Sequence, residues 1–335
     1  MEEKARSDLN NILVYMETDE TGAITQVSLE ALNAAKQIAC DKSASVGIFL
    51  IGDKVSSAAD ELQFHNVDKI YLKEDNRLKS YQPRAFLKIF ERVYENLKPE
   101  LVVFSNSTNS LDFSGRIAFK LNAGLITDCV KIESEKDDIF YTKPVYSNNI
   151  MVVYSCGHLP CIITVRSKSI APSERSEKKE GEIVSVDEEI DLSLDEYDVV
   201  EKVIQKDKGM NLADAKIIVS GGRGVGGSEG FGYLKELADL LGGQVGSTRP
   251  PCDMGWISPG AQVGITGTIV SPSLYIAIGI SGSFQHMAGM IDSKVVIAIN
   301  SDPDANIFKI SNYGVIGEYE EVLPGFIEGI KDSLK

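Results

Sequence analysis

The sequence predicts an α/β protein, with a mostly parallel sheet in an N-terminal domain and a doubly wound sheet in a C-terminal domain. Short apolar runs alternate with helical patterns in both halves of the 335-residue chain, which is typical of parallel strands joined by helices. The alternation stops over residues 166–195 and then resumes. The length suits two domains of roughly 100–200 residues each. We expect them to span residues 1–204, including residues 166–195 as a linker, and residues 205–335.

In the first half, apolar runs predict strands and amphipathic segments predict helices. The predicted strands are Asn11–Met16, 46–52, 69–72 and Leu101–Ser105, and the predicted helices are 29–40, Pro83–Leu97 and 114–121. Residues 140–165 alternate with period two and are rich in β-branched side chains, which predicts antiparallel or mixed strands near the sheet edge. Residues 166–195 are rich in Ser, Glu, Lys and Asp, and we expect an extended, solvated connection between the domains.

The second half begins with a strand at 215–220, followed by a glycine-rich turn. A predicted helix over 231–241 ends at Gly242 and Gly243, which is typical of a left-handed C-cap. Strands are then expected at 274–280 and 294–300, and a helix at 283–290. A last helix is expected over 324–334, with Pro324 tolerated in its first turn. A doubly wound (Rossmann-like) domain accounts for this order.

Composition excludes several classes of function. The net charge of −15 disfavours nucleic acid and anionic membranes as partners. No run approaches the ~18 apolar residues of a membrane span, and the acidic start MEEKARSDLN is no signal peptide. Five cysteines without a CxxC motif argue against a disulfide framework. Cys156 and Cys161 flank His158, but no second pair completes a zinc site. We therefore expect no metal and a bacterial cytoplasm.

A first candidate binding motif is GRGVGG at residues 222–227. It follows a predicted strand and has the GxGxxG pattern of a pyrophosphate-binding turn. The acidic residue expected about 20 positions later, which would hold a ribose, is absent. Arg249 stands at the next strand end and could meet the 2′-phosphate of NADP. An NADP-dependent dehydrogenase and a tight turn without ligand both remain open on this motif.

A second junction, GISGS at residues 279–283, precedes a predicted helix, whose free N–H groups suit a phosphate. It is no hydrolase elbow, because Ser283 replaces the last glycine of GxSxG and no histidine follows in the required order. His286 lies one turn into this helix. The long glycine- and proline-rich segment 247–272 is expected to contact a ligand, with polar groups from Arg249, Gln262, Thr266 and Ser271.

Together these segments resemble the alpha subunit of electron-transfer flavoproteins. The matching pieces are VSGGRG at 219–224, STR at 247–249, QVGITG at 262–267, LYIAIGISGSFQHMAGMID at 274–292, AINSDP at 298–303 and YG at 313–314. The resemblance covers the whole chain and is weaker in the N-terminal part. It implies that residues 205–335 bind FAD. It also implies that the N-terminal domain pairs with a beta subunit of similar fold in a heterodimer.

The resemblance also implies roles for individual residues. Arg223, Thr248 and Arg249 should approach the flavin. Val263 to Thr266 should follow the isoalloxazine, with Thr266 donating toward N5. Ser281 to His286 should hold the pyrophosphate and ring edge, with His286 near O2. Arg249, Thr266 and His286 are the expected flavin-tuning residues. The implied cofactor-binding set is Arg223, Thr248, Arg249, Gln262, Val263, Gly264, Ile265, Thr266, Ser281, Gly282, Ser283, Phe284, Gln285, His286, Asn300, Glu318 and Tyr319.

Three of these positions depart from the family's usual residues. Thr248 stands where many members have serine, Ile265 often has a polar counterpart, and Glu318 replaces a common aspartate. The physical basis of tuning is electrostatic. Reduction of a flavin by one electron leaves negative charge over N1 and the C2 carbonyl, which a fixed cation and hydrogen-bond donors stabilise. Arg249 is always protonated and is the best candidate for raising the potential.

The implied function is a redox carrier rather than a stand-alone enzyme. It would accept electrons from flavoprotein dehydrogenases of the acyl-CoA type, as in fatty acid oxidation, or from NADH through the beta subunit if the complex bifurcates electrons. It would pass them to a quinone reductase, a ferredoxin or a flavodoxin. The alternatives are an NADP-dependent dehydrogenase and a non-catalytic nucleotide-binding module. The colour of the purified protein separates a flavoprotein from the dehydrogenase alternative.

Overall fold

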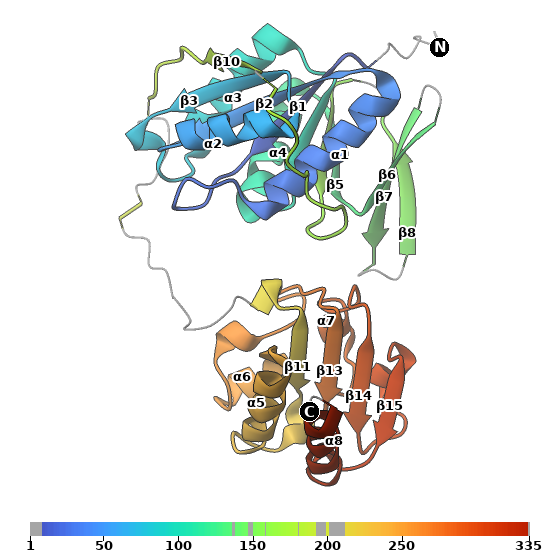
Figure 1. The fold of residues 1–335 in the computed structure, drawn as a ribbon. Coiled ribbons are helices and arrows are strands. Elements are labelled where there is room, and N and C mark those ends of the chain that lie inside the picture. The colour runs from blue at the N-terminus through green and yellow to red at the C-terminus, as the bar shows by residue number, and fades with distance from the viewer. Residues whose placement is uncertain are drawn as a thin grey trace. The chain divides into compact units, whose positions relative to one another are not determined.

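The chain forms an α/β structure, which confirms the predicted fold class (Figure 1). The computed structural model describes residues 9–135, 138–146, 150–157, 159–179, 181–191, 199–200 and 212–333. The chain divides into two compact units, Met1–Lys202 and Val203–Lys335. Each unit has its own sheet and its own hydrophobic core, so we describe each by itself.

A seven-stranded parallel sheet forms the centre of the N-terminal unit, in the order β10-β3-β2-β1-β4-β9-β5. The strands are β1 Asn11–Met16, β2 Ser45–Gly52, β3 Lys69–Glu74, β4 Leu101–Ser105, β5 Gly124–Cys129, β9 Cys161–Val165 and β10 Glu182–Ser185. The four strands predicted before residue 110 are confirmed. The sequence patterns did not predict β5 or β10.

Helices cover both faces of this sheet. They are α1 Gln26–Lys42, α2 Ser56–Leu62, α3 Pro83–Leu97 and α4 Thr108–Leu121. Alternate side chains of a strand point to opposite faces. Accordingly Val14 packs in a cluster with α1 and α2, while Tyr15 packs in a second cluster with α3 and α4. The three predicted helices are confirmed, and α2 is additional.

A three-stranded antiparallel sheet extends the N-terminal unit. It consists of β6 Lys131–Glu135, β7 Asp138–Val145 and β8 Ile150–Ser155. The period-two prediction for residues 140–165 is therefore confirmed for β7 and β8. It is wrong for β9, which lies inside the parallel sheet with all five residues buried. Its continuous apolar sequence CIITV is typical of a strand buried on both faces.

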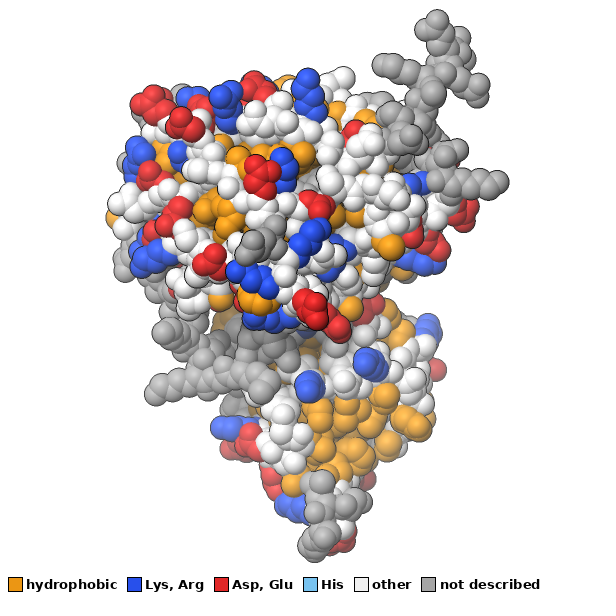
Figure 2. All heavy atoms as spheres, turned by 45° about the horizontal axis from the view of Figure 1, so that its top comes forward, with side chains coloured by type: hydrophobic (Ala, Val, Ile, Leu, Met, Phe, Trp, Pro, Cys, Tyr) orange, Lys and Arg blue, Asp and Glu red, His pale blue; other side chains and the backbone are white. Residues whose placement is uncertain are grey.

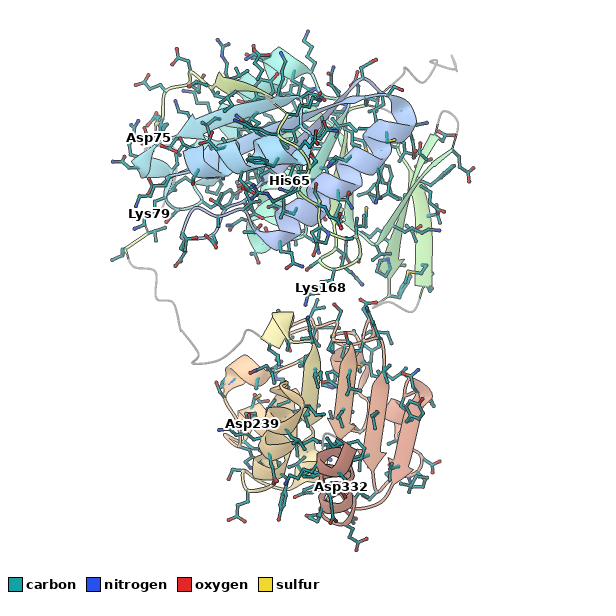
Figure 3. All side chains as sticks on the ribbon, in the orientation of Figure 1. His65, Asp75, Lys79, Lys168, Asp239 and Asp332 are labelled. Atoms are coloured by element: carbon teal, nitrogen blue, oxygen red, sulfur yellow. The ribbon has the colours of Figure 1, made fainter. Side chains whose placement is uncertain are left out.

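The segment expected to be a solvated linker is instead attached to the N-terminal unit over the described residues 166–179 and 181–191. Its strand β10 pairs with β3. The buried Glu30 accepts a hydrogen bond of 2.7 Å from the backbone N–H of Lys168, and His65 Nδ1 lies 3.1 Å from the Ser173 hydroxyl. His65 and Lys168 are labelled in Figure 3. Composition misled the prediction because polar side chains can dock a segment through hydrogen bonds as well as solvate it.

The C-terminal unit contains a five-stranded parallel sheet in the order β12-β11-β13-β14-β15. The strands are β11 Ile217–Gly221, β12 Gln244–Ser247, β13 Leu274–Ile278, β14 Val296–Asn300 and β15 Tyr313–Ile316. The helices are α5 Gly230–Leu241, α6 Arg249–Asp253, α7 Phe284–Met287 and α8 Tyr319–Ser333. Helices α5 and α8 cover one face. The other face is covered mainly by irregular segments that contribute Val263, Val270 and Ile307.

Two predicted helices of this unit differ in the structure. Helix α7 has four residues, half of the expected 283–290. Helix α8 begins at Tyr319, so Pro324 lies inside it rather than in its first turn. Glu320 and Glu321 in the first turn interact favourably with the helix dipole. Short 3-10 helices complete the chain: η1 Gln63–His65, η2 Asn76–Leu78, η4 Leu212–Asp214, η5 Arg223–Val225, η6 Pro259–Ala261 and η7 Asn306–Lys309.

The surfaces of the two units differ in the face that Figure 2 shows. Acidic and basic side chains are interspersed over the N-terminal unit, whereas hydrophobic side chains gather on the C-terminal unit. Strand β15 ends the sheet of the C-terminal unit. Its Tyr313 and Ile316 are 67% and 64% exposed. An exposed apolar edge strand is a surface that proteins usually cover.

Candidate functional site

The carboxyl edge of the C-terminal sheet is the place where a ligand is expected. The chain order reverses at β11, with β12 on one side and β13 on the other. Open parallel sheets bind ligands beyond their carboxyl ends at such a switch point. The three strands end there at Gly221, Ser247 and Ile278, and every candidate segment of the sequence follows one of them, β14 or β15.

The glycines of the GRGVGG turn pack against another backbone segment. The Gly222 N–H donates to Ile278 O at 2.9 Å, and the Gly224 N–H donates to Gly279 O at 3.0 Å. A Cβ atom at Gly222 would lie 2.2 Å from Gly279 O. Helix α5 begins only at Gly230, so the turn does not lead directly into a helix. The glycines are explained by this close approach, and the structure supports the interpretation of the motif as a tight turn.

The segment after β12 contacts the segment after β13 through a short loop at 262–268. The Val263 N–H donates to Ser247 O at 2.8 Å, and the Ile265 N–H donates to Gln285 O at 2.9 Å. Two glycines allow the loop to approach the segment after β13 this closely, because a Cβ at Gly289 would lie 2.4 Å from the Gly264 Cα. The structure therefore brings together three of the predicted binding segments, which are separate in sequence.

Thr266 and Gln262 form a hydrogen bond within this loop. The Gln262 side-chain amide donates to the Thr266 hydroxyl oxygen at 2.9 Å. The hydroxyl oxygen is thereby used as an acceptor, which leaves its O–H free to donate elsewhere. Thr266 and the adjacent Ile265 are exposed. This arrangement suits a hydroxyl that donates to a ligand atom.

Arg249 is the first residue of α6, directly after the buried N-cap residue Thr248. Its Nε donates to Asp253 at 3.1 Å. Both side chains are nearly two-thirds exposed, and an exposed ion pair of this kind contributes ~0.3–0.5 kcal/mol. So weak a contact leaves the guanidinium available to a bound anion.

Backbone donors line the turn after β13. In the part of the chain that the structure describes, the N–H groups of Ser281, Gly282 and Ser283 have no hydrogen-bond partner. Gly282 has φ +80 and lies against the backbone of Ile307 in η7. A Cβ atom on Gly282 would lie 2.2 Å from the Ile307 nitrogen. Consecutive N–H groups around a left-handed residue form a concave anion site. Ser281 and Ser283 add exposed hydroxyls.

His286 is buried with both ring nitrogens engaged. Its Nδ1 lies 3.0 Å from Val263 O, and its Nε2 lies 3.0 Å from the Tyr275 hydroxyl. The carbonyl can only accept, so Nδ1 carries the proton and Nε2 accepts from Tyr275. Burial lowers the pKa of His286 to about 4, and the ring is neutral at pH 7. A ring hydrogen bond to a bound ligand would require one of these two contacts to break.

The His286 ring predicts a pH dependence of stability. Its pKa is about 4 in the folded chain and ~6.5 when unfolded, so the unfolded state binds more protons between these values. The contribution of His286 to the free energy of unfolding should be fully present above pH ~6.5. The free energy of unfolding should then fall by roughly 3 kcal/mol as the pH drops to about 4. Urea unfolding followed by Trp256, the chain's one tryptophan, measures this loss. His286→Gln should remove it, and an equal loss in that variant would contradict the assignment.

Other predicted binding residues have structural partners. The Asn300 amide donates to Ile280 O at 2.8 Å and its oxygen accepts from Asp302 N at 3.0 Å. The Tyr319 hydroxyl donates to Val225 O at 2.9 Å, in the core beneath α8. Asn300 thus connects two strand ends, and Tyr319 anchors a helix. Glu318 is exposed at the start of α8, and Arg223 is exposed in η5.

The residues of this edge fit FAD, the cofactor that the resemblance implies. The free N–H groups at 281–283 suit a pyrophosphate. The Thr266 hydroxyl and the Arg249 guanidinium suit the polar rim of an isoalloxazine ring. Val263, which the sequence placed along the ring, is buried in the core, whereas Ile265 is 49% exposed and offers an apolar surface. The set thus contains donors for the pyrophosphate and for the polar rim of the isoalloxazine ring.

Sequence reasoning missed two residues that shape this site. Tyr275 lies in β13 and holds His286, and Gly289 permits the approach of the 262–268 loop. Tyrosine in an apolar strand looks like an ordinary core residue. Both residues belong to the motif LYIAIGISGSFQHMAGMID, so the signal was present, but only the contacts show their roles.

The chain matches two family models. "Electron transfer flavoprotein domain" matches residues 12–191, and "Electron transfer flavoprotein FAD-binding domain" matches residues 211–291. Electron transfer flavoprotein subunit alpha of Bacillus subtilis is 39% identical over 312 residues, which cover 92% of this chain and 94% of the relative. The subunit alpha of Thermoanaerobacterium thermosaccharolyticum is 36% identical over 331 residues, covering 97% and 99%.

A third relative has a different name. The "Lactate dehydrogenase (NAD(+),ferredoxin) subunit LctC" of Acetobacterium woodii is 33% identical over 328 residues, which cover 97% of this chain and 78% of the relative. Among the described residues, no helix is long and apolar enough to cross a membrane. No group of three or more potential metal ligands occurs within the same residues.

Proposed function

This chain belongs to the electron transfer flavoprotein family as an FAD-binding alpha subunit, and we propose that it carries electrons from flavoprotein dehydrogenases of the acyl-CoA type to a further acceptor. If its beta subunit bifurcates electrons, the donor is NADH. The acceptor is a quinone reductase, a ferredoxin or a flavodoxin. The match to an FAD-binding domain favours this function over an NADP-dependent dehydrogenase.

The observation that carries the proposal is that a hydrogen-bonded loop places Arg249 and Thr266 at the same sheet edge. Bound FAD supplies a centre that takes up and releases electrons singly or in pairs. The Val263–Ser247 hydrogen bond joins the segment of Thr266 to the strand end that precedes Arg249. A fixed cation and a free hydroxyl donor stabilise negative charge on a ligand. We infer that Arg249 and Thr266 tune the flavin in this way, with Gln262 positioning Thr266.

The proposed partner is a beta subunit of similar fold. The N-terminal unit has a surface suited to it in β8, whose Met151 and Val153 are 58% and 57% exposed. Exposed apolar side chains on an edge strand favour coverage by another chain. The acyl-CoA-type dehydrogenase would be a separate, transient partner of the resulting heterodimer.

The direction of electron flow depends on the beta subunit. The relative from Acetobacterium woodii is named as a subunit of a lactate dehydrogenase that uses NAD(+) and ferredoxin. This name supports NADH and ferredoxin as candidate partners for the complex formed by this chain. The relatives from Bacillus subtilis and Thermoanaerobacterium thermosaccharolyticum are named as electron transfer flavoprotein subunits alpha, and these names fit either a simple carrier or a bifurcating complex.

The test is to co-express the chain with its beta subunit, and to measure the flavin content and the flavin spectrum of the purified complex. One FAD per heterodimer, reduced by an acyl-CoA dehydrogenase with its substrate, is the result expected of a simple carrier. Two FAD with bleaching by NADH would establish the bifurcating form. A colourless complex that oxidises or reduces NADP would overturn the proposal in favour of the dehydrogenase.

A further inference from the structure

Two thiols of the N-terminal unit lie side by side although they belong to different elements. Cys161 begins β9 and is paired in register with Gly124 of β5. Cys156 follows β8 directly, and its Sγ lies 2.7 Å from the position that a Cβ atom on Gly124 would occupy. Cys156 therefore fills the side-chain position beside Cys161 on the same sheet face. Cys156 is also the largest influence on the pKa of the Cys161 thiol, as expected of neighbouring thiols.

The two thiols differ in their access to solvent. Cys161 is 1% exposed, whereas Cys156 is partly exposed and lies in a connection where Gly157 and Leu159 are exposed. The Cys156 contact and burial raise the pKa of Cys161 well above the usual thiol range. A dissolved oxidant would therefore meet Cys156 first.

A third thiol nearby is directed away from this pair. Cys129 ends β5, is fully buried, and donates to Ile126 O at 3.5 Å. Burial raises its pKa to about 12, and the pKa of Cys161 is raised as well, so position decides between the two. Cys161 lies beside Cys156, whereas the Cys129 thiol is hydrogen-bonded to Ile126 O, so Cys161 is the neighbour that can react with an oxidised Cys156.

We propose that Cys156 and Cys161 form a reversible dithiol–disulfide pair that is oxidised by hydrogen peroxide. The Cys156 sulfur attacks one peroxide oxygen, the O–O bond breaks, and the departing hydroxide takes the Cys156 proton and leaves as water, so that a sulfenic acid remains on Cys156. The Cys161 sulfur then attacks that sulfur, an S–S bond forms, the S–O bond breaks, and the Cys161 proton leaves with the hydroxyl as a second water. Two thiols lose two electrons and two protons to hydrogen peroxide, and a dithiol reductant reverses the reaction.

The disulfide would join the end of β8 to the start of β9. It would thereby lock the three-stranded sheet to the seven-stranded sheet of the same unit. Intracellular disulfides are usually transient and redox-sensing, which suits a pair with one accessible and one buried thiol. The proposal concerns the N-terminal unit and does not depend on the proposed electron-carrier function.

The test treats the purified full-length protein with hydrogen peroxide, blocks the remaining thiols with iodoacetamide under denaturing conditions, and analyses the peptides by mass spectrometry without reduction. We expect the peptide that contains both Cys156 and Cys161 to lose two hydrogen atoms and to regain them with dithiothreitol. In Cys161→Ser, Cys156 should instead be trapped by dimedone as a sulfenic acid.

Cys40 serves as the matched reference, because it is exposed on α1. Cys40→Ser should leave the mass change of the Cys156–Cys161 peptide intact, whereas Cys156→Ser should abolish it while Cys161 stays a free thiol. The proposal would be overturned if wild-type Cys156 accumulated sulfinic acid with Cys161 still alkylated. It would equally be overturned if both thiols stayed alkylated under conditions that oxidise Cys40.

Discussion

Replacing Arg249 with glutamine is expected to lower the one-electron potential of the bound flavin by about 90–130 mV. A charged hydrogen bond contributes ~2–3 kcal/mol, and ~59 mV corresponds to a tenfold change in equilibrium for one electron. The Asp253 ion pair does not oppose this contribution, because both its partners are nearly two-thirds exposed. Arg249→Lys should recover part of the potential, since lysine keeps the charge but lacks the planar fork of donors.

Spectroelectrochemical titration of the heterodimer measures this difference. Lys331→Gln is the matched control, because it removes an exposed positive charge from the same unit, where Lys331 pairs with Glu236 on α5. The control should shift the potential by far less than Arg249→Gln. Equal shifts in the two variants would show that Arg249 acts only through overall charge, and would remove its proposed role at the flavin.

Replacing Gly289 with alanine is expected to displace the 262–268 loop and to deplete the protein of FAD. The new Cβ would lie 2.4 Å from the Gly264 Cα and 2.5 Å from its nitrogen. These are backbone atoms, which cannot rotate away as a flexible side chain would. Gly264 has φ +146 and is itself close to the Gln285 backbone, so the loop has little room to adjust. We expect a loss of stability of about 1–3 kcal/mol.

Gly232→Ala is the control for the change from glycine to alanine. Gly232 lies in α5, and a Cβ there would meet nothing within 4 Å. Alanine should stabilise this helix by roughly 0.5–1 kcal/mol and leave the FAD content unchanged. The measurements are the flavin absorbance per protein and the urea midpoint. Full FAD content in Gly289→Ala would show that the glycine contact does not position the loop for the cofactor.

The sequence predicted the elements whose signal is local. The buried strands β1, β2 and β4 and the helix α3 follow from apolar runs and helical periodicity, because such patterns depend only on neighbouring residues. The alternation of strands and helices likewise predicted parallel sheets in both halves. The same set of motifs that indicated FAD was sufficient to identify the family, and the matches over residues 12–191 and 211–291 confirm it.

Elements that depend on distant partners were not predictable. The segment 166–191 is polar in composition, yet it docks through β10 and through contacts with Glu30 and His65. Strand β9 is flanked by irregular segments, and only its two neighbours β4 and β5 make it an interior parallel strand. In each case hydrogen bonds with residues far away in sequence determine which strand is the neighbour. The apolar sequence of β9 indicates a buried strand, but it does not specify its partners.

The roles within the binding edge show the same division. The glycine-rich turn at 281–283 already indicated an anion site, because that chemistry belongs to the N–H groups themselves, whereas the flavin roles expected of Arg249 and Thr266 came from the resemblance to the family. That the GRGVGG turn packs on Gly279, that His286 is neutral between Tyr275 and Val263, and that Gly289 admits the loop could be known only from the fold. These properties arise from close approaches between segments that the chain brings together in space.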